Sequence, residues 1–208
     1  MTPLNIIILA AGKGTRMHSN KPKVLHEIGG KSILARVIQS AKALNPSKII
    51  VVYGYGGEVV REAFANENIT WVKQAEQLGT GHAVQQAEPF LDANALSLVM
   101  LGDVPLVDVG ACKALLAQAN NKLAILSFNK ADPTGYGRIV RADSGNVVAI
   151  VEHKDATEAQ RNIIEVNTGI MAMPNMHLSK WLSQLTNNNA QGEYYLTDIV
   201  ALAVQQNV

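Results

Sequence analysis

The sequence of 208 residues holds a single cysteine and few aromatic side chains, which make up 5% of the chain. The lone Cys112 excludes an intramolecular disulfide bond and any zinc cluster built on several cysteines. It lies in a stretch rich in alanine and leucine. We therefore expect a buried thiol without a chemical role.

The chain also lacks an excess of one charge and a long apolar segment. Its 18 basic and 17 acidic side chains give a net charge of +1, which argues against a general nucleic-acid-binding protein. No apolar run exceeds six residues, far short of the roughly 18 that a membrane span needs. No basic residue precedes the first run, as one would in a secretion signal. We expect a cytoplasmic protein that binds neither membranes nor nucleic acids.

What the first part of the sequence does contain is a regular alternation of strand and helix patterns. Short apolar runs rich in β-branched residues predict buried strands at 4–9, 48–53, 69–73 and 96–101. Helical spacing predicts helices capped by Ser32 and Asp108, with two more at 58–65 and 80–91. Such alternation is typical of a parallel sheet with helices on both faces.

The second part of the sequence has a different pattern. Strands are predicted at 123–128 and 163–173, a hairpin at 138–142 and 147–152, and helices at 176–185 and 194–205. We find no repeat and no linker, so we expect one mixed α/β domain over residues 1–208. Its sheet is mostly parallel, with an added antiparallel hairpin. Ligands bind such sheets outside the carboxyl ends of the parallel strands.

A glycine-rich loop follows the first predicted strand, with the sequence Ala10-Ala11-Gly12-Lys13-Gly14-Thr15-Arg16. Its two glycines allow a tight turn and bring backbone N–H groups close to a phosphate. The dinucleotide fingerprint fails because Met17 replaces its third glycine, a Walker loop fails at Leu25, and a zinc-protease motif fails at Gly30. What remains is either an ordinary turn with solvated basic residues or a phosphate loop served by Arg16 and Lys23.

Seven ordered motifs carry a resemblance over the whole chain. They are the segments 9–31, 74–83, 101–106, 135–140, 150–156, 165–169 and 192–198. These segments resemble the sugar-phosphate nucleotidyltransferases, a family with a Rossmann-like fold. Within that family they are most similar to the N-terminal uridylyltransferase domains of bacterial bifunctional enzymes that also carry a glucosamine-1-phosphate acetyltransferase.

The resemblance implies a reaction and a set of site residues. UTP and N-acetylglucosamine 1-phosphate would give UDP-N-acetylglucosamine and pyrophosphate, with Mg²⁺, for cell-envelope synthesis. Arg16 and Lys23 would neutralise the phosphates, and Asp103 would hold the metal. The residues implied to bind the nucleotide or the sugar are Leu9, Ala10, Ala11, Gly12, Lys23, Gln74, Gly79, Thr80, Leu101, Gly102, Asp103, Gly137, Glu152 and Asn167. Of these, Gly137, Glu152 and Asn167 are the three implied for the sugar.

The sequence departs from the family pattern in three respects. Leu101 stands where the family usually has tyrosine, and the family's second metal ligand, an asparagine, would lie beyond Val208. The hexapeptide repeats of the acetyltransferase β-helix are missing as well. We therefore expect a truncated chain without acetyltransferase activity. We also expect a monomer, because the family's homotrimer depends on the β-helix.

Two alternatives to this reading stay open. One is a related nucleotidyltransferase with another base or sugar. The other is a fragment that binds the nucleotide sugar but is catalytically impaired. A nicotinamide dehydrogenase is disfavoured because its fingerprint is missing.

Overall fold

The computed structural model describes residues 2–12, 14, 19, 21–54 and 56–208. Four parallel strands form one half of a mixed sheet, in the order β5-β4-β1-β6. They are β1 (Leu4–Ala10), β4 (Lys48–Tyr53), β5 (Thr70–Lys73) and β6 (Leu96–Leu101). All four were predicted from their apolar runs, and β4 and β6 begin and end at the predicted residues.

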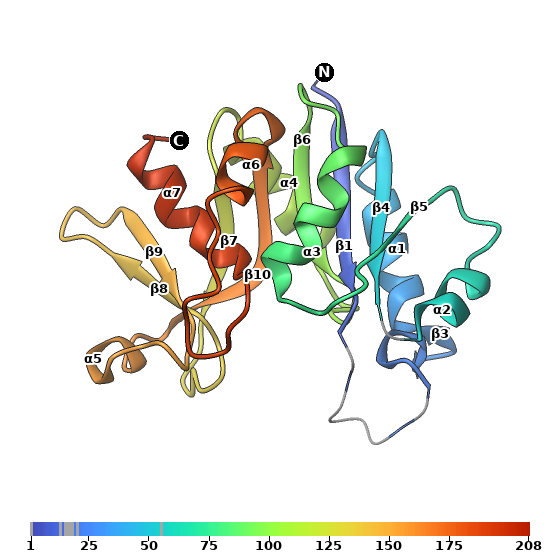
Figure 1. The fold of residues 1–208 in the computed structure, drawn as a ribbon, viewed down its shortest axis with the longest axis horizontal. Coiled ribbons are helices and arrows are strands. Elements are labelled where there is room, and N and C mark those ends of the chain that lie inside the picture. The colour runs from blue at the N-terminus through green and yellow to red at the C-terminus, as the bar shows by residue number, and fades with distance from the viewer. Residues whose placement is uncertain (1, 13, 15–18, 20, 55) are drawn as a thin grey trace.

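Antiparallel strands form the other half of the sheet (Figure 1). The long strand β10 (Glu165–Pro174) pairs with β6 and with β7 (Ala124–Asn129), and its first residues reach the hairpin. That hairpin consists of β8 (Arg138–Arg141) and β9 (Val147–Val151). The predicted mixed sheet with an added hairpin is confirmed.

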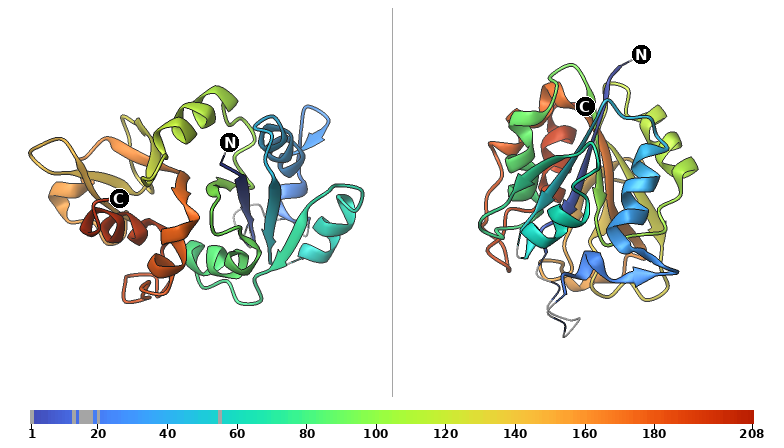
Figure 2. Two further views of the ribbon diagram at one scale, coloured as in Figure 1. Left: turned by 90° about the horizontal axis from the view of Figure 1, so that it is seen from above. Right: turned by 90° about the vertical axis from the view of Figure 1, so that its right-hand side faces the viewer.

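Helices cover both faces of the sheet, as Figure 2 shows. The reason lies in the central strand, where Ile6 and Ile8 point to one face and Ile7 to the other, all of them completely buried. A strand buried on both sides needs a helical layer on each. One layer holds α1 (Ile33–Lys42), α2 (Gly57–Ala63) and α4 (Val109–Gln118), and the other holds α3 (Thr80–Ala87), α6 (Asn175–Leu182) and α7 (Ile199–Gln205).

Both predicted helix caps are present. The Ser32 side chain accepts a hydrogen bond from the N–H of Ala35, and the Asp108 side chain accepts one from the N–H of Ala111. Cys112 lies in α4 and is buried, and burial, followed by the negative charge of Asp108, raises the pKa of its thiol. The thiolate is the reactive form, so the expected inert thiol agrees with this environment.

Some predicted boundaries were wrong. The helix expected at 80–91 ends at Ala87 and continues as the 3-10 turn η3 (Glu88–Phe90), where Pro89 cannot donate a helical hydrogen bond. The helix expected from Tyr194 begins only with η4 (Leu196–Asp198), because Tyr194 hydrogen-bonds to the loop before α3 instead.

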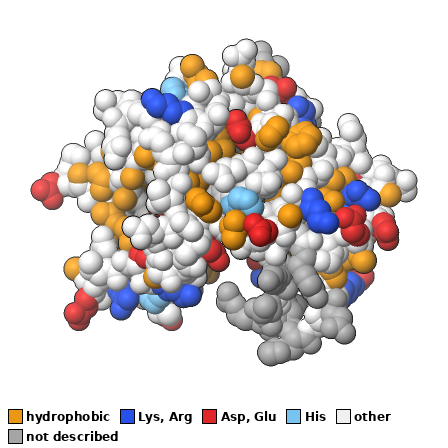
Figure 3. All heavy atoms as spheres, in the orientation of Figure 1, with side chains coloured by type: hydrophobic (Ala, Val, Ile, Leu, Met, Phe, Trp, Pro, Cys, Tyr) orange, Lys and Arg blue, Asp and Glu red, His pale blue; other side chains and the backbone are white. Residues whose placement is uncertain are grey.

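Short elements escaped the sequence analysis. They are the 3-10 turn η2 (Lys23–Leu25), the small hairpin of β2 (Glu27–Ile28) and β3 (Lys31–Ser32), and α5 (Glu158–Arg161). The first three lie between the glycine-rich loop and α1, where no helix or strand was predicted. None of the described helices is both long and apolar enough to cross a membrane. On the face drawn in Figure 3, acidic and basic side chains are interspersed.

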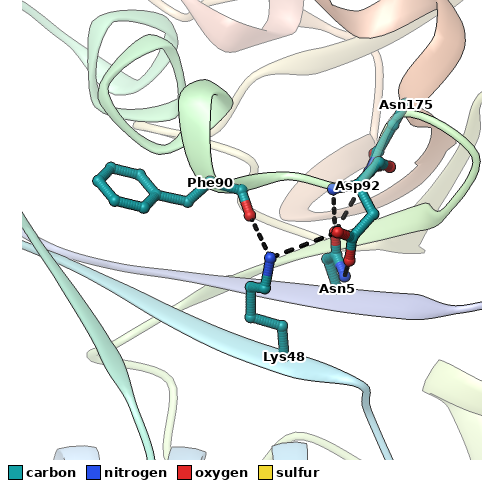
Figure 4. Close-up of polar contacts among 5 residues, drawn as sticks. All are labelled: Asn5, Lys48, Phe90, Asp92 and Asn175. Atoms are coloured by element: carbon teal, nitrogen blue, oxygen red, sulfur yellow. Dashed lines mark hydrogen bonds and ion pairs between the residues drawn. The ribbon is translucent and has the colours of Figure 1, made fainter.

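A polar network closes the amino end of the parallel strands (Figure 4). Asn5 is fully buried, donates to the Asp92 carboxylate at 3.1 Å and accepts from the Asp92 N–H at 3.0 Å. Asn175 donates to the Asp92 carbonyl at 2.8 Å, and the Lys48 ammonium donates to the Phe90 carbonyl at 2.6 Å. The Asn5 amide, followed by the Lys48 charge, lowers the pKa of Asp92. The network ties β1 and β4 to the segment that precedes β6 and to the first residue of α6.

Asn5→Ala should destabilise the protein, because it leaves the Asp92 N–H and the Asn175 amide without their common partner. We expect a loss of about 2 kcal/mol in the free energy of unfolding, on the scale of an unsatisfied buried polar group. Urea unfolding followed by circular dichroism measures it. The control is Asn66→Ala at an exposed position. Equal stabilities of the two variants would contradict the role of Asn5.

Candidate functional site

A cleft of about 540 Å³ opens at the carboxyl ends of β1, β5 and β6, where parallel sheets bind ligands. Strand ends, the loop before α3 and one residue from the loop after α6 enclose it. Its lining residues are Leu9, Ala10, Ala11, Gly12, Val24, Gln74, Gln77, Gly79, Thr80, Ala83, Leu101, Asp103 and Glu193. Nine of the fourteen residues that the resemblance implied for ligand binding belong to this lining.

Gly102 lies directly behind the cleft. Its N–H donates to the Leu9 carbonyl at 2.8 Å, and a Cβ at this position would lie 3.0 Å from the Cβ of Ala10. The ends of β1 and β6 can therefore approach closely only because residue 102 is glycine and residue 10 is small. This close approach shapes the floor of the cleft.

A lysine and an aspartate meet at the mouth of the cleft. The Lys23 ammonium lies 2.6 Å from the Asp103 carboxylate, and both side chains are more than a third exposed. Lys23 is the first residue of η2, and this turn places Lys23 near the carboxyl ends of the parallel strands. A Cβ at Gly14, where φ is +60°, would lie 2.9 Å from the Cβ of Lys23, so the glycine-rich loop packs directly on Lys23. The other predicted cation, Arg16, lies outside the described residues.

Gln74 follows β5 and is buried, with 3% of its surface exposed. Its side-chain Nε2 donates to the Gly79 carbonyl at 3.1 Å and lies 3.0 Å from Nδ1 of His82. These contacts fix the amide and leave Oε1 to accept a hydrogen bond from a ligand. Gly79 itself has φ of +110°, and a Cβ there would lie 2.5 Å from the Tyr194 carbonyl.

The three residues implied for the sugar lie together on the antiparallel half of the sheet. A Cβ at Gly137 would lie 3.3 Å from a carboxylate oxygen of Glu152, and the Asn167 N–H donates to the Gly137 carbonyl at 2.9 Å. Leu101, which lines the cleft, lies against Gly169, two residues after Asn167. A Cβ at Gly169 would lie 2.8 Å from the Leu101 side chain. The structure thus brings the predicted sugar residues to one side of the cleft.

The electrostatic environment of Glu152 is unfavourable to a charge. Burial raises the pKa of its carboxyl group, and the negative charges of Asp198, Asp155 and Glu193 raise it further. Only a hydrogen bond from the Thr197 hydroxyl, at 3.1 Å, opposes them and lowers the pKa. The ionised form of Glu152 therefore lowers the stability of the folded protein, while its carboxylate oxygens can accept hydrogen bonds from a ligand.

Sequence reasoning assigned no role to several residues of the site. Val24, Gln77 and Ala83 line the cleft, and each lies in a segment that carried the resemblance, 9–31 or 74–83, without being given a role. The same holds for Glu193 and Thr197, which lie in the segment 192–198. For Gln77 the only signal was its place within the segment 74–83. For Thr197 the only signal was its place within the segment 192–198.

The described residues contain no group of three or more potential metal-ligating side chains. Mg²⁺ does not need one, since it keeps several water molecules and is often held by one or two carboxylates together with substrate phosphates. The single carboxylate of Asp103, at the mouth of the cleft, fits that mode of binding. Its present partner, Lys23, would have to leave it.

Known proteins resemble this chain over nearly its whole length. Residues 6–167 match the family model of the MobA-like NTP transferase domain. The chain is 61% identical to the bifunctional protein GlmU of Methylobacillus flagellatus over 97% of its own length and 43% of that protein, and 56% identical to that of Dechloromonas aromatica over 99% and 45%. It spans less than half of these relatives.

Solved structures of other nucleotidyltransferases share the fold. A putative glucose-1-phosphate thymidylyltransferase from Bacillus anthracis superposes with a TM-score of 0.79 at 20% identity, covering 99% of this chain and 84% of that one. A UDP-glucose pyrophosphorylase complexed with UDP-glucose gives 0.77 at 19% identity, covering 100% and 88%. At these identities the likeness concerns the fold alone.

Glu152→Gln should stabilise the free protein at neutral pH. The folded-state pKa of Glu152 lies above the unfolded value, so the wild type loses stability as pH rises from the unfolded pKa through the folded one. Glutamine does not ionise and avoids that loss. We expect a melting temperature about 2–4 °C above the wild type at pH 7.5 and a smaller difference near pH 4. The control is Glu62→Gln on exposed α2; a pH-independent difference would contradict the assignment.

Proposed function

We propose that this chain, which belongs to the MobA-like NTP transferase family, is the uridylyltransferase part of a GlmU-type protein. It would join UTP and N-acetylglucosamine 1-phosphate to give UDP-N-acetylglucosamine and pyrophosphate. The high identity to GlmU proteins supports this proposal. The observation that carries it is the Lys23–Asp103 pair, set at the mouth of a cleft lined by the predicted nucleotide residues.

The cleft suits a uracil base. Because the Gln74 amide hydrogens are directed to Gly79 and His82, its Oε1 is the atom available to a ligand. An acceptor can take the N3–H of uracil, whereas cytosine has no hydrogen at N3. Ala10, Ala11 and Gly12 carry little or no side chain, which leaves room for a flat base and a ribose beside the strand end.

Transfer of the nucleotidyl group needs positioning and charge neutralisation more than covalent help. Lys23 would leave Asp103 and place its point charge on the triphosphate, with Arg16 as the second cation. When bound at Asp103, Mg²⁺ supplies charge neutralisation of the phosphate oxygens. The sugar phosphate is already deprotonated at neutral pH and needs no general base. His82 and His153 are engaged with Gln74 and Arg138, so we give neither an acid-base role.

The sugar would be held beside the cleft on the antiparallel half of the sheet. Glu152 can accept hydrogen bonds from hydroxyl groups, while the Gly137 N–H and the Asn167 amide can donate them. Leu101 contributes an apolar side chain where the family usually has tyrosine. We further propose a cytoplasmic location and a monomer. We assign acetyl transfer to none of these residues, since no β-helix occurs among the described elements.

The direct test is a pyrophosphate-release assay with UTP, N-acetylglucosamine 1-phosphate and Mg²⁺. A panel of CTP, dTTP, glucose 1-phosphate and galactose 1-phosphate distinguishes base and sugar preference. We expect UTP and the N-acetylated sugar to be preferred. Preference for another pair would favour a related nucleotidyltransferase. Binding of UDP-N-acetylglucosamine without pyrophosphate release would favour a catalytically impaired domain.

Asp103→Asn should raise the Mg²⁺ concentration needed for half-maximal activity by roughly tenfold to a hundredfold, the scale for perturbed metal ligation. The amide keeps the shape of the side chain but loses its charge. The Mg²⁺ dependence of initial rates at saturating UTP measures the effect. The control, Asp143→Asn in the exposed turn of the β8–β9 hairpin, should leave the titration unchanged. An unaltered titration for Asp103→Asn would remove it as the metal ligand.

A further inference from the structure

The segment Glu193–Asp198 contacts both halves of the proposed site. On the nucleotide side, the Tyr194 N–H donates to the Leu78 carbonyl and the Tyr194 carbonyl accepts from the Gly81 N–H, both at 2.8 Å. The Leu196 N–H donates to the Thr80 hydroxyl oxygen at 3.1 Å. The backbone of this segment is therefore anchored to the loop that begins α3.

On the sugar side, the same segment reaches Glu152 through one hydroxyl group. Thr197 is buried, with 6% of its surface exposed, and its Oγ1 lies 3.1 Å from Oε1 of Glu152. An ionised carboxylate only accepts hydrogen bonds, so the hydroxyl is the donor. Because the backbone before Thr197 is anchored to the nucleotide side, the position of this donor is set independently of the ligand.

The other groups around Glu152 oppose its charge. Asp155 follows β9, Glu193 lies in the loop after α6, and Asp198 ends η4; all three are acidic, and all raise the pKa of Glu152. Burial raises the pKa of a further neighbour, the phenol of Tyr195, to about 12, so this group stays neutral.

The nearest cation on the paired strand does not compensate for these acidic groups. The guanidinium of Arg138 is directed to His153 and to the carbonyls of Tyr136 and Arg161. No ion pair reaches Glu152 within the part of the chain that the structure describes. The Thr197 hydroxyl is thus the one donor recorded there for the ionised form.

We propose that Thr197 is a positioning residue, which holds Glu152 as an oriented carboxylate for the sugar hydroxyl groups. The negative charge of Asp198 opposes the ionised form that Thr197 favours. The inference deepens the proposed function and rests on it. A protonated Glu152 has one acceptor fewer and would turn its proton toward the ligand. Thr197 therefore sets the lowest pH at which the sugar is bound well.

The test measures the dissociation constant of UDP-N-acetylglucosamine by calorimetry across about pH 5 to 8, a range in which this ligand has no titrating group. Thr197→Val keeps the shape of the side chain and removes the donor. Affinity should fall toward acidic pH, and this fall is the acid limb of the affinity profile. We expect the acid limb to lie about one pH unit higher in this variant than in the wild type, the scale of a hydrogen bond to a charged group. At pH values on that limb, binding should weaken by up to about tenfold, and UTP binding should stay unchanged.

Asp198→Asn should move the same limb in the opposite direction, by a smaller amount, because it removes a repelling charge. A merely structural role would weaken binding in both variants without an opposite shift, and that result would overturn the proposal. Thr197→Ser restores a hydroxyl and should restore the wild-type profile. The control Thr70→Val, on β5 at the far edge of the sheet, should leave it unchanged. If the wild type fails to bind UDP-N-acetylglucosamine, the proposed function has failed, whatever the variants do.

Discussion

The burial of the central strands on both faces is the constraint on which the rest of the structure depends. In β1, Ile6 and Ile8 face one helical layer and Ile7 faces the other, and each of the three is fully buried. Such a strand can exist only between two layers of helices and between neighbouring strands. The register that follows pairs Ala10 with Tyr53 and Leu9 with Leu101. The packing of the core thereby fixes which residues reach the carboxyl edge together, and of these Leu9, Ala10 and Leu101 line the cleft.

The two ends of the parallel strands use their polar groups differently. At the amino end, Asn5, Asp92 and Asn175 hydrogen-bond to one another and contribute to stability (Figure 4). At the carboxyl end, polar groups sit in a cleft where a ligand can complete their hydrogen bonds. Lys23 and Asp103 do pair there, but an ion pair this exposed is worth only about 0–1 kcal/mol. A triphosphate can therefore separate the pair at little cost to the fold.

Much of the fold could be predicted because local patterns and tertiary packing agree. The apolar runs of β4 and β6 gave their bounds, and Ser32 and Asp108 act as the expected caps. The predicted helix from Tyr194 failed at its start because a loop more than a hundred residues earlier binds that backbone. No local pattern encodes such a contact. The same holds for the site: glycine spacing indicated a phosphate loop, whereas the sugar residues were assigned by resemblance and their hydroxyl donor was missed.

The acidic surroundings of Glu152 agree with its proposed role of accepting hydrogen bonds from the sugar. A carboxylate paired with a cation would be stable, yet its acceptor capacity would be used within the protein. Three acidic neighbours and one neutral donor leave the remaining oxygen lone pairs available to a ligand. The fold pays for this arrangement with a charge that burial disfavours, and the large buried core beneath α6 and α7 supplies the stability to tolerate it. Anchoring the donor through Tyr194 and Leu196 then links the geometry of the proposed sugar side to the loop proposed to hold the nucleotide.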